Sequence, residues 1–233
     1  MSFMKKYLFL LLLFPGWIFA QDRQIIEVTS GDDLDERISY HLQYLFPEFT
    51  IGDVIYKDAP LGAGMINYNL LVGEMQFLAD DEVMALANIR DIAMVYIDNR
   101  KFYPFNNKEF AEELLSTDKV QLRVRRRGSM VPYAKRGAYG ASSPTSAITS
   151  YNSINNASQQ HNLSVMGDVM VTLKYFYYLV GQNGRYTQIN NVKAFTKLFP
   201  VHRAQIEAYA KENNIRFDNV NDLKVLLVYC NTL

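Results

Sequence analysis

The chain contains 233 residues and has as many basic as acidic side chains, 24 of each, so its formal net charge is zero. Apolar residues make up 49% of it and aromatic residues 13%, which is enough to bury a core and excludes wholesale disorder. The balanced charge gives no general affinity for nucleic acid, so we expect no nucleic-acid partner.

Residues 1–20 have the pattern of a signal peptide. Lys5 and Lys6 precede an unbroken apolar run over residues 7–14, and Ala20 places a small residue before a cleavage point. The run is shorter than the roughly 20 residues that a spanning helix needs, and no later run is long enough. We therefore expect cleavage, export to the periplasm or outer membrane, and a mature chain without a transmembrane segment. An uncleaved membrane anchor is the alternative.

The chain has one cysteine, Cys230, so no internal disulfide can form. It lies in an apolar segment and is most simply a small buried hydrophobe. An intermolecular bridge or a reactive thiol is the alternative that the sequence leaves open.

Residues 21–48 form the predicted N-terminal helical segment. Ser30 and Asp33 have the spacing of a capping box, and the apolar residues that follow recur at helical intervals up to Leu45. The next proline ends the pattern, so we expect a helix over residues 30–46. Its acidic start complements the helix dipole, which explains the cluster without a metal.

Residues 49–190 largely alternate apolar and polar positions, which predicts an antiparallel β domain. Asn67 and Asn69 lie on the polar face of a strand that carries Ile66 on its apolar face. Beyond this strand the apolar residues shift from even to odd numbers. A bulge or tight turn near residues 72–74 must therefore return them to the same face.

A turn is expected at Asp80-Asp81, and a two-residue hairpin turn is expected at Asp98-Asn99. A short helix over residues 108–115, capped by Asn106 or Asn107, is predicted to interrupt the strands.

The strand predicted over residues 119–127 separates its side chains most strongly. Its apolar face carries Val120, Leu122 and Val124, whereas its other face carries Arg123, Arg125 and Arg127. Residues 119–136 contain seven basic and no acidic side chains. This pattern suits an acidic protein surface, an anionic polysaccharide or a phosphate-bearing glycolipid. The alternative is a solvated outer face or an edge strand protected by charge.

Residues 128–163 are rich in Gly, Ser, Asn, Gln and Tyr and predict a long loop. Tyr139 and the other tyrosines could stack on sugars or a partner, or could equally hold the loop against its own domain. Strands resume near residue 169 and turn at residues 181–184. Residues 191–233 predict a C-terminal helical segment packed on the sheet.

No zinc-binding or nucleotide-binding pattern occurs, so we expect no metal and no cofactor. The most suggestive polar group is Asn67 and Asn69 with Glu74 beyond the turn, which could bind a carbohydrate or a peptide backbone. The alternative is that the two asparagines satisfy neighbouring backbone groups.

The run at residues 65–77 (MINYNLLVGEMQF), the GAYG sequence at residues 137–140 and the helical C-terminal segment resemble an uncharacterised family of exported proteins from Bacteroidota. The resemblance covers most of the mature chain. It implies export, and it implies no established activity, cofactor or catalytic residue.

Together these patterns predict an α+β fold: a curved, mostly antiparallel sheet, either open or partly closed into a barrel, with an N-terminal helix and C-terminal helices. We expect a non-catalytic exported protein that binds or scaffolds an envelope protein, glycan or glycolipid through the basic strand and the tyrosine-rich loop. One alternative is a carrier that shelters a lipid between sheet and helices. The other is a small glycan or peptide hydrolase that uses Glu74 or His41.

Overall fold

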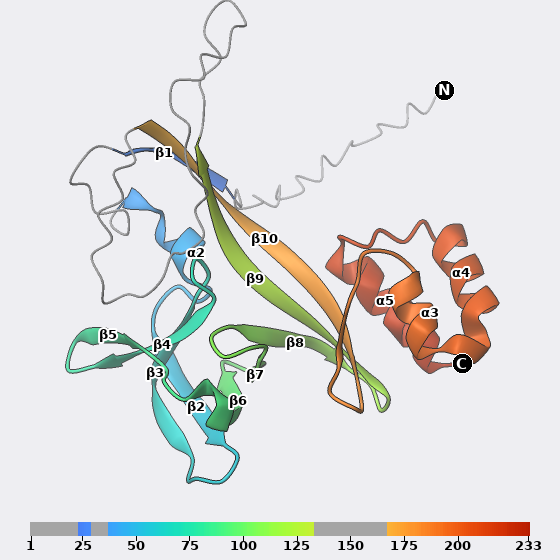
Figure 1. Cartoon of the computed structure of the whole chain (residues 1–233), viewed down its shortest axis with the longest axis horizontal. Coiled ribbons are helices and arrows are strands. Elements are labelled where there is room, and N and C mark those ends of the chain that lie inside the picture. Colours follow the sequence, from blue (N-terminus) through green and yellow to red (C-terminus); the bar gives the residue numbers. More distant parts are fainter. Residues whose placement is uncertain (1–22, 29–36, 133–166) are drawn as a thin grey trace, which may run out of the picture.

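The computed structural model describes residues 23–28, 37–132 and 167–233. These residues form one sheet of 11 strands in the order β1-β10-β9-β8-β7-β6-β2-β3-β4-β5, with β11 paired to β10 (Figure 1). The strands are β1 (Arg23–Val28), β2 (Thr50–Tyr56), β3 (Gly62–Asn69), β4 (Glu74–Ala79), β5 (Glu82–Ala85), β6 (Ile92–Ile97), β7 (Arg100–Pro104), β8 (Phe110–Ser116), β9 (Val120–Pro132), β10 (Gly167–Gly181) and β11 (Tyr186–Gln188). The helices are α2 (Tyr40–Gln43), α3 (Lys193–Leu198), α4 (Arg203–Glu212) and α5 (Val220–Asn231), with 3-10 turns η1 (Ile89–Asp91) and η2 (Pro200–His202).

All strand pairs in the described part of the chain are antiparallel, which confirms the predicted sheet. The sheet is open, with β1 and β5 at its two ends, so the option of a partly closed barrel is wrong. The tip of the β3–β4 hairpin does reach across to β9, where the Gly128 N–H donates to the Leu70 carbonyl at 2.7 Å. This contact does not join the two ends of the sheet.

The two faces of the sheet differ in what they carry. Because side chains alternate along a strand, the register between strands carries each face across the sheet. The face that bears the buried residues Val95 and Phe102 is called the inner face here. Phe102 pairs with Glu112 of β8, which pairs with Val124 of β9, so Val124 also lies on the inner face. Its neighbours Arg123 and Arg125 therefore lie on the outer face.

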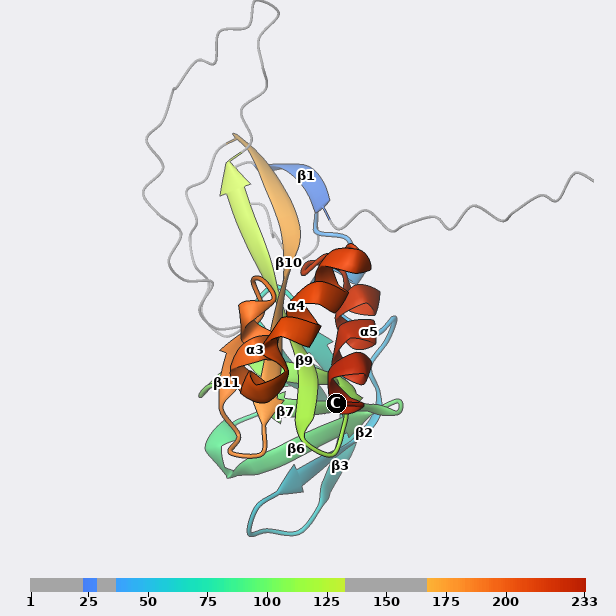
Figure 2. The same cartoon turned by 90° about the vertical axis from the view of Figure 1, so that its right-hand side faces the viewer.

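The C-terminal helices cover the inner face of β9 and β10 (Figure 2). Leu122 of β9 and Leu179 of β10 pack there with Leu226 of α5, and all three are fully buried. This confirms the predicted C-terminal helices. Cys230 lies in the same cluster, and burial raises the pKa of its thiol to about 12, so the thiol stays protonated.

The predicted turns are confirmed by backbone conformation. Asp80 and Asp81 have φ of 50° and 65°, and Asp98 and Asn99 have φ of 44° and 60°. Two consecutive positive values are typical of the type I′ turn that joins twisted strands. The shift in apolar parity is resolved by a hairpin turn between β3 and β4, where Gly73 adopts a φ of 74°.

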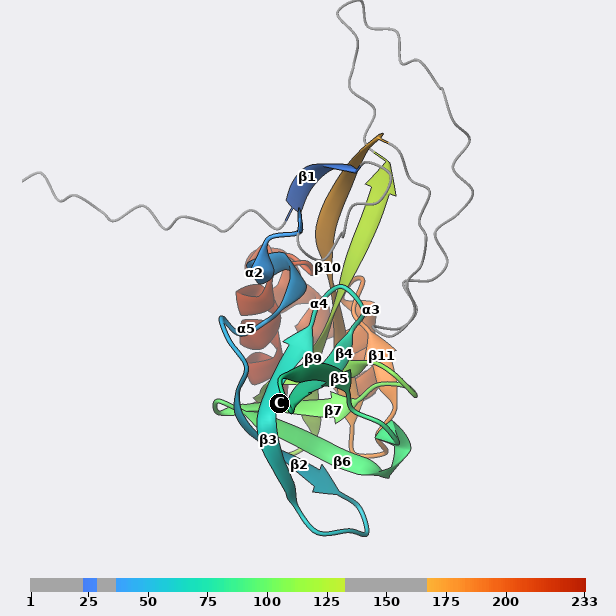
Figure 3. The same cartoon turned by 90° about the vertical axis from the view of Figure 1, so that its left-hand side faces the viewer.

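The predicted N-terminal helix over residues 30–46 is not confirmed. Residues 29–36 lie outside the described ranges, and the helix found is the four-residue α2, which packs near β1 and β10 (Figure 3). It ends because the following segment runs beside β3: the Leu45 N–H donates to Tyr68 O, and the Leu70 N–H donates to Gln43 O. Strand pairing therefore overrides the helical periodicity of this segment.

The predicted helix over residues 108–115 is wrong, because this segment forms β8. Asn106 does accept hydrogen bonds from the N–H groups of Lys108 and Glu109, as a helix cap would. The chain then extends between β7 and β9, and an inner position is taken by Glu112. A buried carboxylate at an inner position hid the strand pattern.

The first five residues of the predicted loop over residues 128–163 form the end of a strand instead. Strand β9 continues to Pro132, paired along its whole length with β10. Residues 133–166 lie outside the described ranges, and Tyr139 is among them.

Candidate functional site

Asn67, a predicted ligand-binding residue, lies buried beneath the segment that leads into β2. The pairs Tyr44–Asn69 and Thr50–Ile66 bracket a bulge, because one chain advances six residues (50 − 44) while β3 advances three (69 − 66). The amide of Asn67 fills it by accepting from the Phe46 N–H at 3.1 Å and donating to Phe46 O at 3.0 Å. Asn67 therefore replaces backbone hydrogen bonds that the bulge removes.

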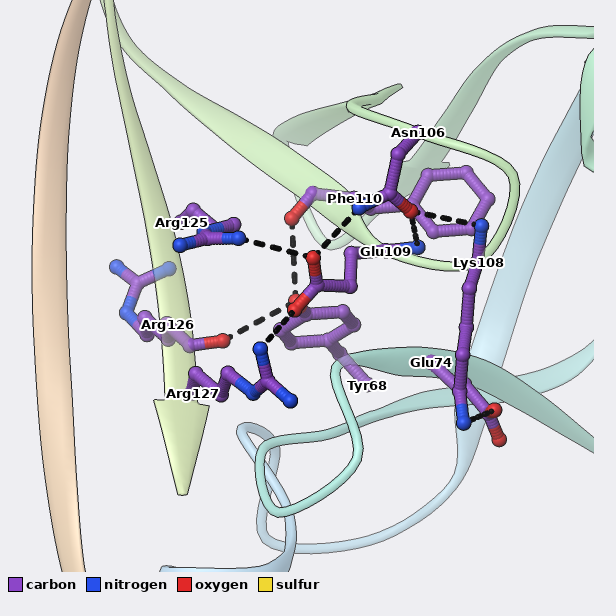
Figure 4. A network of polar contacts seen from close by, with 9 residues as sticks. All are labelled: Tyr68, Glu74, Asn106, Lys108, Glu109, Phe110, Arg125, Arg126 and Arg127. Carbon is purple, nitrogen blue, oxygen red and sulfur yellow. Dashed lines mark hydrogen bonds and ion pairs between the residues drawn. The ribbon is translucent and has the colours of Figure 1, made fainter. Parts of the chain in front are cut away.

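Asn69 and Glu74 frame the β3–β4 turn. The Asn69 side-chain oxygen accepts from the N–H of Leu71 at 3.0 Å, and its amide nitrogen donates to Gln76. Glu74 is buried, and its carboxylate pairs with Lys108 Nζ at 2.8 Å (Figure 4). The structure places Asn67, Asn69 and Glu74 near one another but engages each within the protein, as the structural alternative describes.

Glu109 organises the middle of β9 (Figure 4). Its Oε2 accepts from Arg125 Nη1 at 2.9 Å and from the Asn106 amide at 2.6 Å. Its Oε1 accepts no hydrogen bond from the described residues, and Arg127 Nη1 lies 3.8 Å away. One buried carboxylate is thus shared between two guanidinium groups, and Arg127 is the more loosely held of the two.

Glu112 is the anchor of the inner face. Its carboxylate accepts two hydrogen bonds from Arg100, at 2.7 and 2.6 Å, and a further one from Arg126. Burial alone would raise the pKa of Glu112, but the hydrogen bonds and charges of Arg100 and Arg126 outweigh it. The pKa of this carboxyl therefore lies below its ordinary value.

Arginine and aromatic side chains interleave on the outer face. The Arg123 guanidinium lies 3.7 Å from the ring centroid of Tyr103 and donates to the hydroxyl of Tyr186. The Arg125 guanidinium lies between Phe105 and Phe176, 4.8 and 4.7 Å from their centroids. These contacts hold the two arginines in fixed orientations.

The next pair along β9 and β10 is Arg127 opposite Lys174. The Arg127 side chain is 57% exposed and Lys174 is exposed as well. Opposite residues of an antiparallel pair have Cβ atoms about 4.5–5.5 Å apart, where like charges repel. We call this pair the cationic rung, and an anion placed on it would relieve the repulsion.

The outer-face residues on five consecutive rungs of these strands include four cations and no acid. They are Gln121 and Val180, Arg123 and Tyr178, Arg125 and Phe176, Arg127 and Lys174, and Ser129 and Thr172. Of the predicted site residues, the structure therefore gathers Arg123, Arg125 and Arg127 on one strip and leaves only Arg127 well exposed. Sequence reasoning missed Lys174, although its alternation with Leu173 and Tyr175 placed it on a polar face.

Two further findings bear on the chemistry of the described residues. Within them, no three His, Cys, Asp or Glu side chains are grouped so that they could hold a metal ion. No helix in the same ranges is long and apolar enough to cross a membrane. Comparison of the chain with protein families, curated proteins and solved structures finds no match.

Proposed function

We propose that this chain is a non-catalytic exported binding protein that holds an anionic glycan of the cell envelope on the outer face of β9 and β10. The observation that carries the proposal is the cationic rung, where Arg127 and Lys174 face each other on an open part of the sheet. Like charges placed opposite each other weaken a sheet unless an opposite charge compensates them, and the nearest carboxylate oxygen, Glu109 Oε1, lies 3.8 Å from Arg127 Nη1.

The surroundings of the rung favour an acidic sugar. The rings of Phe105 and Phe176 flank Arg125 next to it and are partly exposed. Aromatic rings offer flat apolar surfaces, and guanidinium groups bind carboxylates and sulfates with paired donors. An acidic polysaccharide presents both features, since its rings carry carboxylate or sulfate groups.

Export supports the same proposal from the sequence. Residues 1–20 have the composition of a signal peptide, and a cleaved chain would meet envelope polymers directly after secretion.

The test measures binding of the mature chain, residues 21–233, to polygalacturonate, with neutral dextran as the reference polymer. Replacing both rung residues, Arg127→Gln with Lys174→Gln, should weaken binding at least tenfold, because two charge-assisted contacts are lost. The matched control is Lys197→Gln with Lys211→Gln, which makes the same change in net charge on exposed positions of α3 and α4.

The control variant should bind as the native chain does, and thermal unfolding should show both variants folded. Arg123 and Arg125 are unsuitable for this test because their burial and internal bonds would couple binding to folding. Equal affinity of the rung variant and the native chain would contradict the proposal. Binding of polyglutamate as tight as that of polygalacturonate would show that charge alone, without sugar, is recognised.

A further inference from the structure

A second feature of the outer face lies far from the cationic rung. Four large apolar side chains on β2, β3, β4 and β5 are exposed: Ile51 by 74%, Met65 by 40%, Leu78 by 37% and Val83 by 41%. These strands are neighbours in the sheet (Figure 3). Scattered apolar residues are ordinary on a surface, so their mutual placement decides what they mean.

The register places the four in one row. Ile51 pairs with Met65, and Leu78 pairs with Val83. Between them, Ile66 pairs with Phe77, so Met65 and Leu78 stand opposite each other one position further along. Opposite residues share a face, and the four side chains therefore form a continuous apolar row across four strands.

The row ends at an open edge. Strand β5 is the last strand of the sheet, and all four of its residues are exposed. Figure 1 shows it on the outside of the molecule. An edge strand with apolar side chains and free backbone groups is a template for pairing with another strand.

We propose that β5 pairs antiparallel with β5 of a second copy of this chain, centred on Val83. A two-fold axis perpendicular to the sheet keeps both outer faces on the same side. With Val83 opposite Val83 of the second copy, the two apolar rows join into one. The interface is isologous, which is the commonest arrangement in soluble oligomers.

The charges near β5 agree with this register. Asp80, Asp81 and Glu82 lie together at one end of the strand. In the antiparallel pair Glu82 faces Met84 of the second copy, and the two turns that carry Asp80 and Asp81 lie at opposite ends of the paired strands, so no acid faces an acid. A parallel pair in the same register would set the acids against one another, which costs stability.

The test uses disulfide cross-linking. The one natural cysteine, Cys230, is fully buried and its thiol stays protonated, so an introduced cysteine is the reactive one. Val83→Cys places two thiols directly opposite each other, within the separation that a disulfide spans. We expect a covalent dimer to form under mild oxidation at micromolar protein concentration.

The matched control is Ile51→Cys, which is more exposed but lies three strands away from β5. It should cross-link at least tenfold more slowly than Val83→Cys. Equal rates for the two variants would overturn the proposal, because they would reflect random collision or face-to-face packing.

Sedimentation of the native mature chain gives a measurement without cysteines. It should show a monomer–dimer equilibrium, and Val83→Lys should shift it to the monomer while circular dichroism shows the fold retained. A native chain that stays monomeric up to millimolar concentration would overturn the proposal. The outcome of the polygalacturonate experiment does not affect this test, because the cationic rung on β9 and β10 and the edge strand β5 lie at separate places in the sheet.

Discussion

Arg126 and Arg127 are neighbours on β9 and have opposite surroundings. Arg126 faces inward, its side chain is 12% exposed, and it shares the Glu112 carboxylate with Arg100. Arg127 faces outward, is 57% exposed, and has a carboxylate oxygen of Glu109 at 3.8 Å and a lysine across the strand pair.

The difference shows how one strand assigns two uses to one residue type. On the inner face, a buried charge is costly unless it is paired and hydrogen bonded, so Arg126 comes with a partner. On the outer face, water screens the charge, and an unbalanced cation is tolerated. The inner charge of Arg126 therefore belongs to folding, and among the outer arginines of β9 it is the exposed Arg127 that is available for a ligand.

The largest expected effect comes from breaking the inner cluster. Glu112→Gln leaves Arg100 and Arg126 facing a neutral amide, and removing one partner of a buried pair costs about 3–5 kcal/mol. Urea unfolding measures this loss. The matched control is Glu207→Gln, whose exposed pair with Arg203 contributes less than about 1 kcal/mol.

The same variant makes a pH prediction. The pKa of Glu112 is lower in the folded chain than its ordinary value of 4.5. Its stabilisation is therefore fully present above pH 4.5 and is lost as the pH falls through the folded pKa. The difference in unfolding free energy between the native chain and Glu112→Gln should be constant at neutral pH and shrink in acid. A pH-independent difference would show that the carboxylate charge is not the cause.

Gly128, the residue after Arg127, lies where the β3–β4 turn packs against β9. A Cβ added at Gly128 would lie 2.7 Å from Leu71 Cα, so the backbone of the turn would have to move. Gly128→Ala should cost about 1–3 kcal/mol, as overpacking does. Gly64→Ala is the control, because a Cβ there meets no atom within 4 Å. Equal stability of the two variants would mean that the turn yields without cost.

Much of this fold could be predicted from local signals. Three kinds of signal each depend on residues that are close together in the sequence. They are the Asp and Asn pairs at the turns, the alternation of apolar and polar residues along β9, and the apolar side of the C-terminal helix. Asn219 caps α5 by accepting from the N–H groups of Asn221 and Asp222, which is a contact between near neighbours in the sequence.

The failures share a physical cause, which is a partner distant in sequence. Residues 44–46 are diverted from helix by their bonds to β3, and β8 is held as a strand between β7 and β9. The buried Glu112 is stable only because Arg100 and Arg126 reach it from other strands. For the same reason, the cationic rung depends on Lys174, which lies 47 residues after Arg127 (174 − 127).

The smallest expected effect tests whether the cationic rung is unfavourable to the fold itself. Lys174→Glu replaces two like charges by an opposite pair with Arg127, and such cross-strand changes are worth about 0.2–1 kcal/mol. The variant should therefore unfold at a higher urea concentration than the native chain while it loses affinity for polygalacturonate. Lys174→Gln should lie between the two in stability, and the gain should shrink in 1 M salt because the Debye length falls to about 3 Å. A variant that is no more stable than the native chain would show that Glu109 already compensates the rung, and the repulsion that motivates an anionic ligand would be gone.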